Sequence, residues 1–377
     1  MKPTPETVEQ LKSRLAAAEK ELRAIQKHNL TADVIRREIY DLPVVSTPPT
    51  WLTKTSTRDP VSHRPATTLS EVPMTIWSDW HWGELVDPEQ VGGTNKFNRK
   101  IARERVKRLV TATIDLAKNH NGNIQDAFDG EDPNTYPGIV VALGGDMITG
   151  AIHDELRETN DGSVMQAMLE VEEALIWGLG QMADEFGHVF VPCVVGNHGR
   201  GTLKPRAKGR VHDALEWNIY CHLERWFRND KRLLFQVPGG TDAYFKVFDH
   251  RFMLTHGDSL GVKGGDGIIG AIGPITRGTF KIGRQQSRIG RDIDTLVMGH
   301  WHAYMPRGEM CPVIVNPSLI GPSEFGHLFL RAPPGQPSQA LWWLHPVRGV
   351  TAQRQVTVEP TGRLLAGTEW VSFERRK

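Results

Sequence analysis

Residues 74–81 read MTIWSDWH, an apolar run that ends in an aspartate and a histidine. The run is short, contains β-branched and aromatic side chains and follows a proline, so it predicts a buried β-strand. Similar short runs, which end in Gly, Asp, His or Asn, recur along the chain and alternate with longer segments of helical periodicity. This alternation predicts an α/β fold.

The same pattern places the other elements along the chain. The expected strands cover residues 74–78, 139–144, 188–195, 244–248, 252–255, 295–298, 313–315 and 328–330, with further strands at 340–344 and 356–358. The expected helices cover residues 99–120, 164–186 and 211–228. The helix over 164–186 carries one apolar stripe, which we expect to face the core. The stripe consists of Val164, Met168, Val171, Leu175, Leu179, Met182 and Phe186.

Composition divides the chain into four parts. Residues 1–40 predict an amphipathic helical segment, because apolar residues recur there at spacings of three and four. This helix either docks on its own domain or contacts a second copy or a protein partner. Residues 41–72 are Pro-rich and predict a linker or an extended wrap over the body. Residues 73–325 form the main α/β domain, and residues 326–377 add strands that complete or decorate it.

The overall composition excludes several classes of protein. The 377 residues include 45 Lys and Arg and 44 Asp and Glu, so the formal net charge is +1. This balance excludes a globally basic nucleic-acid coat protein but permits local basic patches. The three cysteines form no CxxC pair, which argues against disulfides and thiolate zinc sites and favours a reducing compartment. Without a signal peptide or an apolar run of ~20 residues, we expect a cytoplasmic protein with no membrane contact.

Residue types that bind metals follow several of the expected strands. In open α/β sheets, segments from distant parts of the chain converge at the carboxyl ends of the strands. In an extended segment, side chains at i and i+2 point to the same side. We therefore expect the two ligand-type residues on either side of Trp80, and the two on either side of Trp301, to point in the same direction. The five segments are Asp79-Trp80-His81, Gly145-Asp146, Gly196-Asn197-His198, His256-Gly257-Asp258 and Gly299-His300-Trp301-His302.

These motifs, in this order, resemble the signature of the calcineurin-like metallophosphoesterase family: D-x-H, G-D, G-N-H, H and G-H-x-H. The resemblance covers about residues 74–318. It implies a four-layer αββα sandwich of two mixed sheets flanked by helices, with a binuclear metal site. Carried over to this sequence, the resemblance implies that one metal ion is bound by Asp79, His81 and His302. The other ion is bound by Asn197, His256 and His300. Asp146 is the catalytic residue whose carboxylate binds both ions.

The chemistry of these residue types is consistent with such a site. Two divalent ions about 3.5 to 4 Å apart lower the pKa of water and stabilise phosphoryl oxygens during in-line attack. A carboxylate can bridge two ions because it has two oxygens, whereas each imidazole serves one ion. Imidazole, carboxylate and amide ligands without thiolate favour Mn²⁺, with Fe, Zn²⁺ and Mg²⁺ as alternatives.

Four further residues are candidates for contact with substrate or ligands. His198 resembles the family histidine that is not a ligand, which implies that it stabilises the transition state and protonates the leaving group; the alternative is a histidine that orders the loop. His153 is a candidate to face phosphate or is a surface histidine. Asp258 is expected to orient a ligand histidine. Arg200 is expected to face the substrate.

Two segments depart from the family's protein phosphatases. Where those enzymes have G-D-x-V-D-R-G and G-N-H-E, residues 145–150 read GDMITG and residues 196–200 read GNHGR. A protein phosphatase is therefore disfavoured. Two basic runs contain no acidic residue and are expected to be loops. They favour binding of an extended polyanion such as DNA or RNA; the alternative is that they are ordinary solvent-exposed charged segments. Their candidate contacts are Arg200, Lys204, Arg206, Lys208 and Arg210 in the first run, and Arg277, Lys281, Arg284, Arg288 and Arg291 in the second.

The expected function is hydrolysis of phosphodiesters, most consistent with a nuclease that resembles the superfamily's double-strand-break-repair exonucleases. The Gly-rich stretch 261–273 and the stretch 316–324, which reads NPSLIGPSE, also resemble phage-encoded members. One alternative is a phosphatase or phosphodiesterase for a small nucleotide, in which the basic runs act as lids. A second alternative is a non-catalytic nucleic-acid-binding or assembly protein on the same scaffold.

Overall fold

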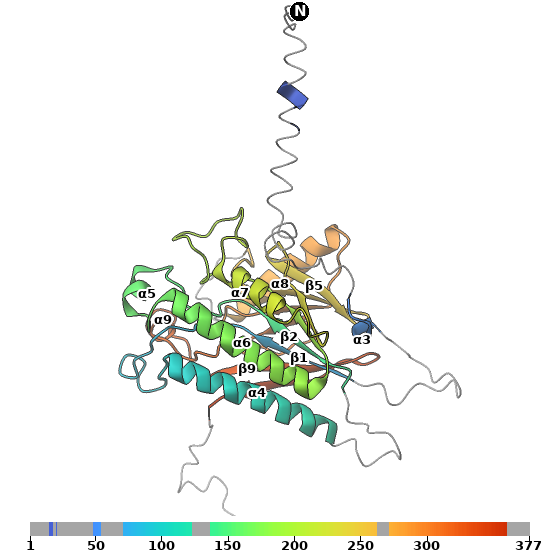
Figure 1. Ribbon diagram of the computed structural model, residues 1–377, viewed down its shortest axis with the longest axis horizontal. Coiled ribbons are helices and arrows are strands. Elements are labelled where there is room, and N and C mark those ends of the chain that lie inside the picture. The colour runs from blue at the N-terminus through green and yellow to red at the C-terminus, as the bar shows by residue number, and fades with distance from the viewer. Residues whose placement is uncertain are drawn as a thin grey trace, which may run out of the picture.

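The computed structural model describes residues 15–17, 20, 48–53, 71–122, 136–261 and 271–359. Within these ranges the chain is of the α/β class, with two mixed sheets and helices (Figure 1). The larger sheet has six strands, of which β1 to β4 run parallel and β9 and β10 are antiparallel to their neighbours. In spatial order these strands are Gly349–Thr357 (β10), Ser338–His345 (β9), Val72–Trp77 (β1), Ile139–Leu143 (β2), Val189–Pro192 (β3) and Leu233–Gln236 (β4).

The smaller sheet has four strands in the order β5-β6-β7-β8. Strand β5 pairs antiparallel with β6, whereas β6, β7 and β8 are parallel. The strands are Asp242–Val247 (β5), His250–Thr255 (β6), Thr295–Met298 (β7) and Val313–Val315 (β8). The parallel strands β1, β2, β3, β7 and β8 are short and buried throughout, as expected for strands covered on both faces.

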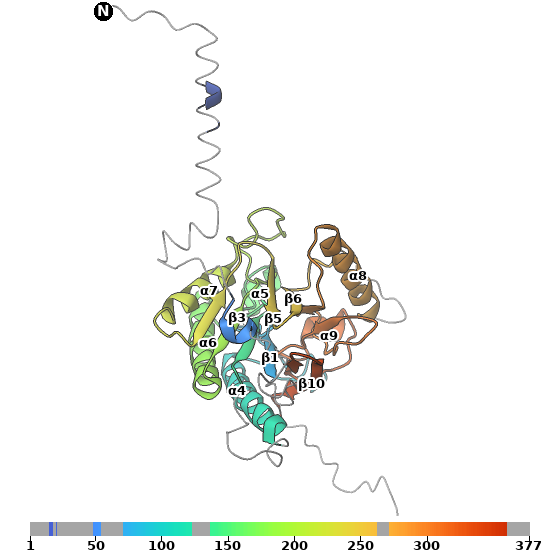
Figure 2. The ribbon, with the colours of Figure 1, turned by 90° about the vertical axis from the view of Figure 1, so that its right-hand side faces the viewer.

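Alternation along each central strand places the two sheets face to face. In β1, Trp77 packs into the cluster beneath the helices, while Ile76 packs into the cluster between the sheets, where Phe252 of β6 also lies. Helices Arg99–Gly122 (α4), Val164–Phe186 (α6) and Leu215–Trp226 (α7) cover the outer face of the larger sheet. Helix Ile272–Arg288 (α8) covers the outer face of the smaller sheet, which gives four layers (Figure 2).

Helix α6 shows how local sequence determines an element. Ser163 caps its N-terminus by accepting a hydrogen bond from the Gln166 backbone N–H, and the Gln166 side chain bonds back to complete a capping box. Gly187 ends the helix with φ 71°, a conformation that glycine adopts without steric cost. The expected apolar stripe is confirmed, since all its members except the half-buried Val164 are buried.

Two elements correct the sequence-based expectations. The segment 328–330 is not a strand, because Ser323 caps the short helix Glu324–Leu328 (α9), which ends there. Phe329 and Leu330 follow with large exposed fractions, so their apolar character does not reflect burial. The basic run 277–291 is not a loop, since helix α8 occupies most of it. The unexpected elements include the strand β4 and the helix Asp154–Thr159 (α5).

The structure describes little of the N-terminal segment and most of the C-terminal strands. Of the expected N-terminal helix, only residues 15–17 and 20 are described, and they are helical. Within the Pro-rich stretch, Thr50–Thr53 (α3) docks on the body, because Leu52 is fully buried and its carbonyl accepts a hydrogen bond from the Phe248 N–H. The C-terminal strands β9 and β10 join the larger sheet. Among the described residues, no helix combines the length and the apolar character needed to cross a bilayer.

We expect Leu175→Ala to lower the free energy of unfolding by about 2–5 kcal/mol, because the side chain is fully buried under α6 and its removal leaves a cavity. Leu169 lies on the same helix with 62% of its surface exposed, so Leu169→Ala is the matched control and should change that free energy by at most about 0.5 kcal/mol. Urea unfolding of both variants checks this. Equal effects would show that α6 does not bury the assigned face.

Candidate metal centre

The ligand-type residues gather where strands of both sheets end. Backbone hydrogen bonds join the first two segments, from the Asp79 N–H to the Gly145 carbonyl at 3.0 Å and from the His81 N–H to the Asp146 carbonyl at 3.1 Å. The segments after β6 and β7 are joined in the same way, by a 2.9 Å bond from the Gly299 N–H to the His256 carbonyl. The convergence expected from the strand pattern is therefore present in the structure.

The backbone at these positions is unusual. Among the described residues, seven non-glycine residues have positive φ, and five of them are candidate ligands. A side chain in this region costs about 1–3 kcal/mol, so such residues persist where surrounding contacts fix them, and they concentrate at functional sites. The five are Asp79 (54°), His81 (48°), Asp146 (52°), His300 (68°) and His302 (50°).

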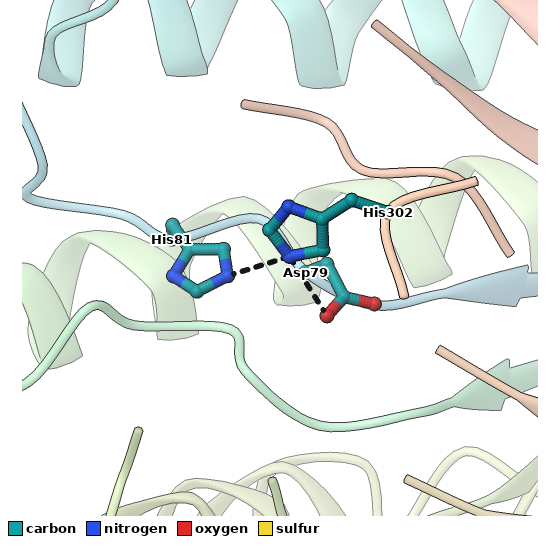
Figure 3. Close-up of side chains that lie close together, drawn as sticks. All are labelled: Asp79, His81 and His302. Atoms are coloured by element: carbon teal, nitrogen blue, oxygen red, sulfur yellow. Dashed lines mark hydrogen bonds and ion pairs between the residues drawn. The ribbon is translucent and has the colours of Figure 1, made fainter. Parts of the chain in front are cut away.

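One group consists of Asp79, His81 and His302 (Figure 3). His302 Nε2 lies 3.1 Å from His81 Nε2 and 3.3 Å from Asp79 Oδ1, and the donor atoms of all three residues lie within 4.8 Å of one another. Asp79 and His81 are buried, whereas the His302 side chain is 34% exposed. The group is thus reached from solvent on the His302 side.

A second group consists of Asp146, His256 and His300. His256 Nδ1 bonds to the Gly144 carbonyl at 2.8 Å, so Nε2 faces inward, 3.0 Å from Asp146 Oδ2. Asn197 Oδ1 also lies 3.1 Å from His256 Nε2. All seven expected ligands therefore lie in this group or the first, or in contact with one of them.

The electrostatic field in the second group favours a positive charge. Burial disfavours the charged form of His256, but nearby carboxylates, chiefly that of Asp146, together outweigh burial and raise the His256 pKa to about 10. Burial and the charge of His256 lower the pKa of His300 to about 4. Burial raises the pKa of Asp146, but neighbouring charges, mainly that of His256, hold it well below its usual value. A buried carboxylate that stabilises a cation in this way suits a metal ion.

The donor set also fits metal binding. It offers imidazole nitrogens, carboxylate oxygens and one amide oxygen, with no thiolate among its members. Such a mixture suits Mn²⁺, Fe or Zn²⁺ better than an all-oxygen Ca²⁺ site. The buried histidine and aspartate groups are thus compatible with a metal site in both spacing and chemistry.

His198 lies between the two groups. Its backbone N–H donates to Asp146 Oδ1 at 2.7 Å, its Nδ1 bonds to the Thr149 carbonyl at 2.9 Å, and its ring meets the His81 ring edge-on at 4.6 Å. Burial lowers the His198 pKa. Since Nδ1 is engaged by a carbonyl, Nε2 is the nitrogen that remains available to a substrate.

Two residues not singled out as site residues orient Asp79. The Ser78 hydroxyl donates to Asp79 Oδ2, and Asn316 Nδ2 donates to the Ser78 hydroxyl at 2.8 Å. Asn316 is fully buried directly after β8. The sequence contains a signal for it, since a polar Asn-Pro-Ser directly after an apolar strand resembles the other ligand segments.

Glu216 on α7 ties two ligand segments together. Its carboxylate accepts hydrogen bonds from the Met147 N–H at 2.7 Å and from the Gly196 N–H at 2.6 Å. These amides directly follow Asp146 and precede Asn197. Burial raises the Glu216 pKa to about 7. Glu216 was not predicted as a site residue, although a carboxylate on the apolar face of an amphipathic helix is a recognisable sequence feature.

The three remaining candidate residues differ in what they contact. His153 is exposed before α5 and belongs to none of the ligand groups found among the described residues. Asp258 forms a 2.8 Å ion pair with Arg210, and its expected role of orienting a ligand histidine stays a prediction. Arg200 donates to the Asn197 carbonyl at 2.6 Å, so it supports the backbone of that ligand segment.

The basic residues form a loop and a helical stripe. In the loop, Lys204, Arg206 and Lys208 are exposed, although Arg206 lies 3.8 Å from the Asp213 carboxylate. The spacing of the basic residues on α8 places them along one side of the helix, where all are exposed. This stripe consists of Arg277, Lys281, Arg284 and Arg288. The loop before α7 and the helix α8 rise on the same side of the molecule (Figures 1 and 2).

Comparison with models of known protein families gives no match for this sequence, and no curated protein is significantly similar to it. A functional assignment therefore depends on the geometry and chemistry of the site. That geometry comprises buried histidine and aspartate groups within metal-binding distance of one another.

Replacing Glu216 tests the tie between the ligand segments. Glu216→Ala removes the acceptor of two buried amides, each worth about 1–3 kcal/mol, so we expect the free energy of unfolding to fall by about 2–6 kcal/mol. Glu158→Ala, at an exposed position of α5, is the control and should have little effect. Guanidinium unfolding measures both. A loss below about 0.5 kcal/mol for Glu216→Ala would contradict the assignment.

Proposed function

We propose that this protein is a metal-dependent phosphoesterase of the calcineurin-like superfamily, with a binuclear centre that hydrolyses phosphodiester bonds in nucleic acid. The observation that carries the proposal is the meeting of all five motif segments at strand ends of two facing sheets. Two mixed sheets between layers of helices are also what the family resemblance leads one to expect. The fold, the ligand types and their order along the chain thus support one interpretation.

The family resemblance divides these residues between two ions, and the two groups are consistent with that division. One ion, with Mn²⁺ favoured, would be held by Asp79, His81 and His302, and the other by Asn197, His256 and His300, with Asp146 shared. Such ions lower the pKa of water and neutralise charge on phosphoryl oxygens. The buried carboxylates of Asp79 and Asp146 would offset the charge of the ions.

His198 is placed to handle a proton. The bond from Nδ1 to the Thr149 carbonyl fixes the neutral ring with its hydrogen on Nδ1, so Nε2 can take up or release a second proton. The bond from its backbone N–H to Asp146 holds the residue beside the ligand cluster. In this position a protonated Nε2 would donate to the leaving-group oxygen of the phosphoester.

The basic residues favour a polymeric substrate. A loop with exposed Lys204, Arg206 and Lys208 follows the ligand segment of Asn197, and helix α8, which carries the basic stripe, lies on the same side of the molecule (Figures 1 and 2). Cations spread over two elements match a chain of phosphates better than one phosphate group. Hydrolysis of a small nucleotide is the alternative, which the experiments below distinguish.

Asp146→Asn should abolish both metal binding and hydrolysis, because the variant lacks the carboxylate assigned to both ions. Asp154→Asn, on the exposed first turn of α5, is the control and should retain both. Elemental analysis of the purified proteins counts the ions. A full metal complement in Asp146→Asn would refute the shared-ligand assignment.

His198→Ala should keep the metal ions but lower kcat by roughly 10²- to 10⁴-fold, the usual range for a general acid. His345→Ala is the control, because His345 ends β9 beside the start of β1, at the opposite end of that strand from Asp79. Hydrolysis of bis-p-nitrophenyl phosphate and a metal count measure both effects. Unchanged turnover would remove His198 from the mechanism.

Replacing Lys204, Arg206 and Lys208 together with Ala should weaken DNA or RNA binding and flatten its salt dependence. Each lost phosphate contact removes about 0.7 to 0.9 from the slope of log affinity against log salt. Hydrolysis of bis-p-nitrophenyl phosphate should stay within a few-fold of the parent, since that substrate is too short to reach the loop. The control triple variant replaces Lys107, Lys118 and Lys246, which are exposed on α4 and β5.

This comparison also separates polymer from small-molecule chemistry. If DNA and RNA cleavage is absent or indifferent to the triple substitution while a mononucleotide or cyclic nucleotide is turned over well, the nuclease assignment fails and the small-nucleotide phosphoesterase replaces it. If the parent binds metal and hydrolyses no phosphoester, the scaffold serves a non-catalytic role.

A further inference from the structure

The two ring nitrogens of His81 lie in different surroundings. Nε2 faces the first ligand group, 3.1 Å from His302 Nε2. Nδ1 points away from the group, is buried, and has no hydrogen-bond partner in the part of the chain that the structure describes. The carboxylate oxygen Oε2 of Glu84 lies 3.7 Å from this Nδ1. A buried ring nitrogen without a hydrogen-bond partner and a carboxylate therefore lie next to each other.

The Glu84 carboxylate is held in that position by its surroundings. Its backbone N–H donates to the His81 carbonyl at 3.1 Å, which closes a turn, and its side chain is only 16% exposed. The Thr149 hydroxyl lies 3.3 Å from Glu84 Oε2 and 2.9 Å from the His81 carbonyl oxygen. The turn and this hydroxyl place the carboxylate beside the ring independently of any metal.

An imidazole that binds a metal through Nε2 is neutral and carries its hydrogen on Nδ1. A carboxylate that accepts this hydrogen fixes the tautomer and ring orientation and makes Nε2 a stronger ligand. The 3.7 Å separation exceeds an ordinary N–H···O distance by less than about 1 Å, so a small rotation of the ring or the carboxylate closes it.

We infer that Glu84 is a positioning residue: its carboxylate accepts a hydrogen bond from the Nδ1–H of His81 and so orients Nε2 to bind the first metal ion. The inference rests on the proposed function for the metal itself. Glu84 would not touch the substrate or the ion, and its effect would pass entirely through His81.

The first test reads the ring directly in the metal-free protein. Long-range ¹H–¹⁵N spectra at pH 8 report which nitrogen of His81 carries hydrogen. We expect the Nδ1–H form in the parent and in Glu84→Gln, whose amide oxygen can still accept. Glu84→Ala should shift His81 toward the Nε2–H form. An unchanged tautomer in Glu84→Ala would overturn the inference.

The second test measures Mn²⁺ binding from the free-ion signal in electron paramagnetic resonance. Glu84→Ala should weaken one of the two binding steps by about 10- to 100-fold and leave the other unchanged, while Glu84→Gln restores much of the loss. Glu158→Ala, at an exposed position of α5, is the control. Parent-like affinity at both steps in Glu84→Ala would also overturn the inference.

The two readouts separate this inference from the proposed function. If the parent binds no Mn²⁺, Fe or Zn²⁺, the proposed function fails, yet the spectra of metal-free Glu84→Ala still decide whether Glu84 fixes the ring. If metal binds normally and the tautomer is indifferent to Glu84, only the role of Glu84 is lost. Thermal unfolding of Glu84→Gln and Glu84→Ala confirms that each variant is folded.

Discussion

The buried carboxylate of Asp146 is the constraint on which the centre of the molecule depends. A charge with 1% exposure must be compensated, and this one is compensated by the 3.0 Å contact with His256 and by the His198 backbone N–H. A Cβ at Gly196 would lie 2.0 Å from Asp146 Oδ1, so only glycine permits this close approach. The contacts of one side chain thus fix three segments that are distant in sequence.

Much of this arrangement could be predicted because two strong signals coincide. Short apolar runs mark buried parallel strands, and the strands at 295–298 and 313–315 are found with the expected bounds. Polar metal-ligand residues follow such runs directly, and parallel strands bring their ends together. Pattern and topology were therefore enough to predict that the segments with Asp79, Asp146 and His256 meet.

The remaining features depend on tertiary context that periodicity does not carry. Helix α8 was not predicted because glycine and basic residues interrupt its apolar periodicity. Its buried face has only a few large apolar side chains, such as Ile275 and Ile282. The segment 328–330 is apolar but exposed, so hydrophobicity there misled the strand prediction. Glu216 accepts hydrogen bonds from two backbone amides, and Glu84 lies beside one ring nitrogen of His81; no spacing rule reveals such contacts.

The position of β9 has a consequence for how the protein is made. Strand β1, which leads to the first ligands, is paired on one side with β2 and on the other with β9, where Val72 faces Leu344. During synthesis from the N-terminus, β1 therefore lacks one neighbour until β9, which comes long after it in the sequence, has left the ribosome. Until then an apolar strand edge stays open to pairing with other chains, so aggregation of nascent or truncated protein is the hazard built into this topology.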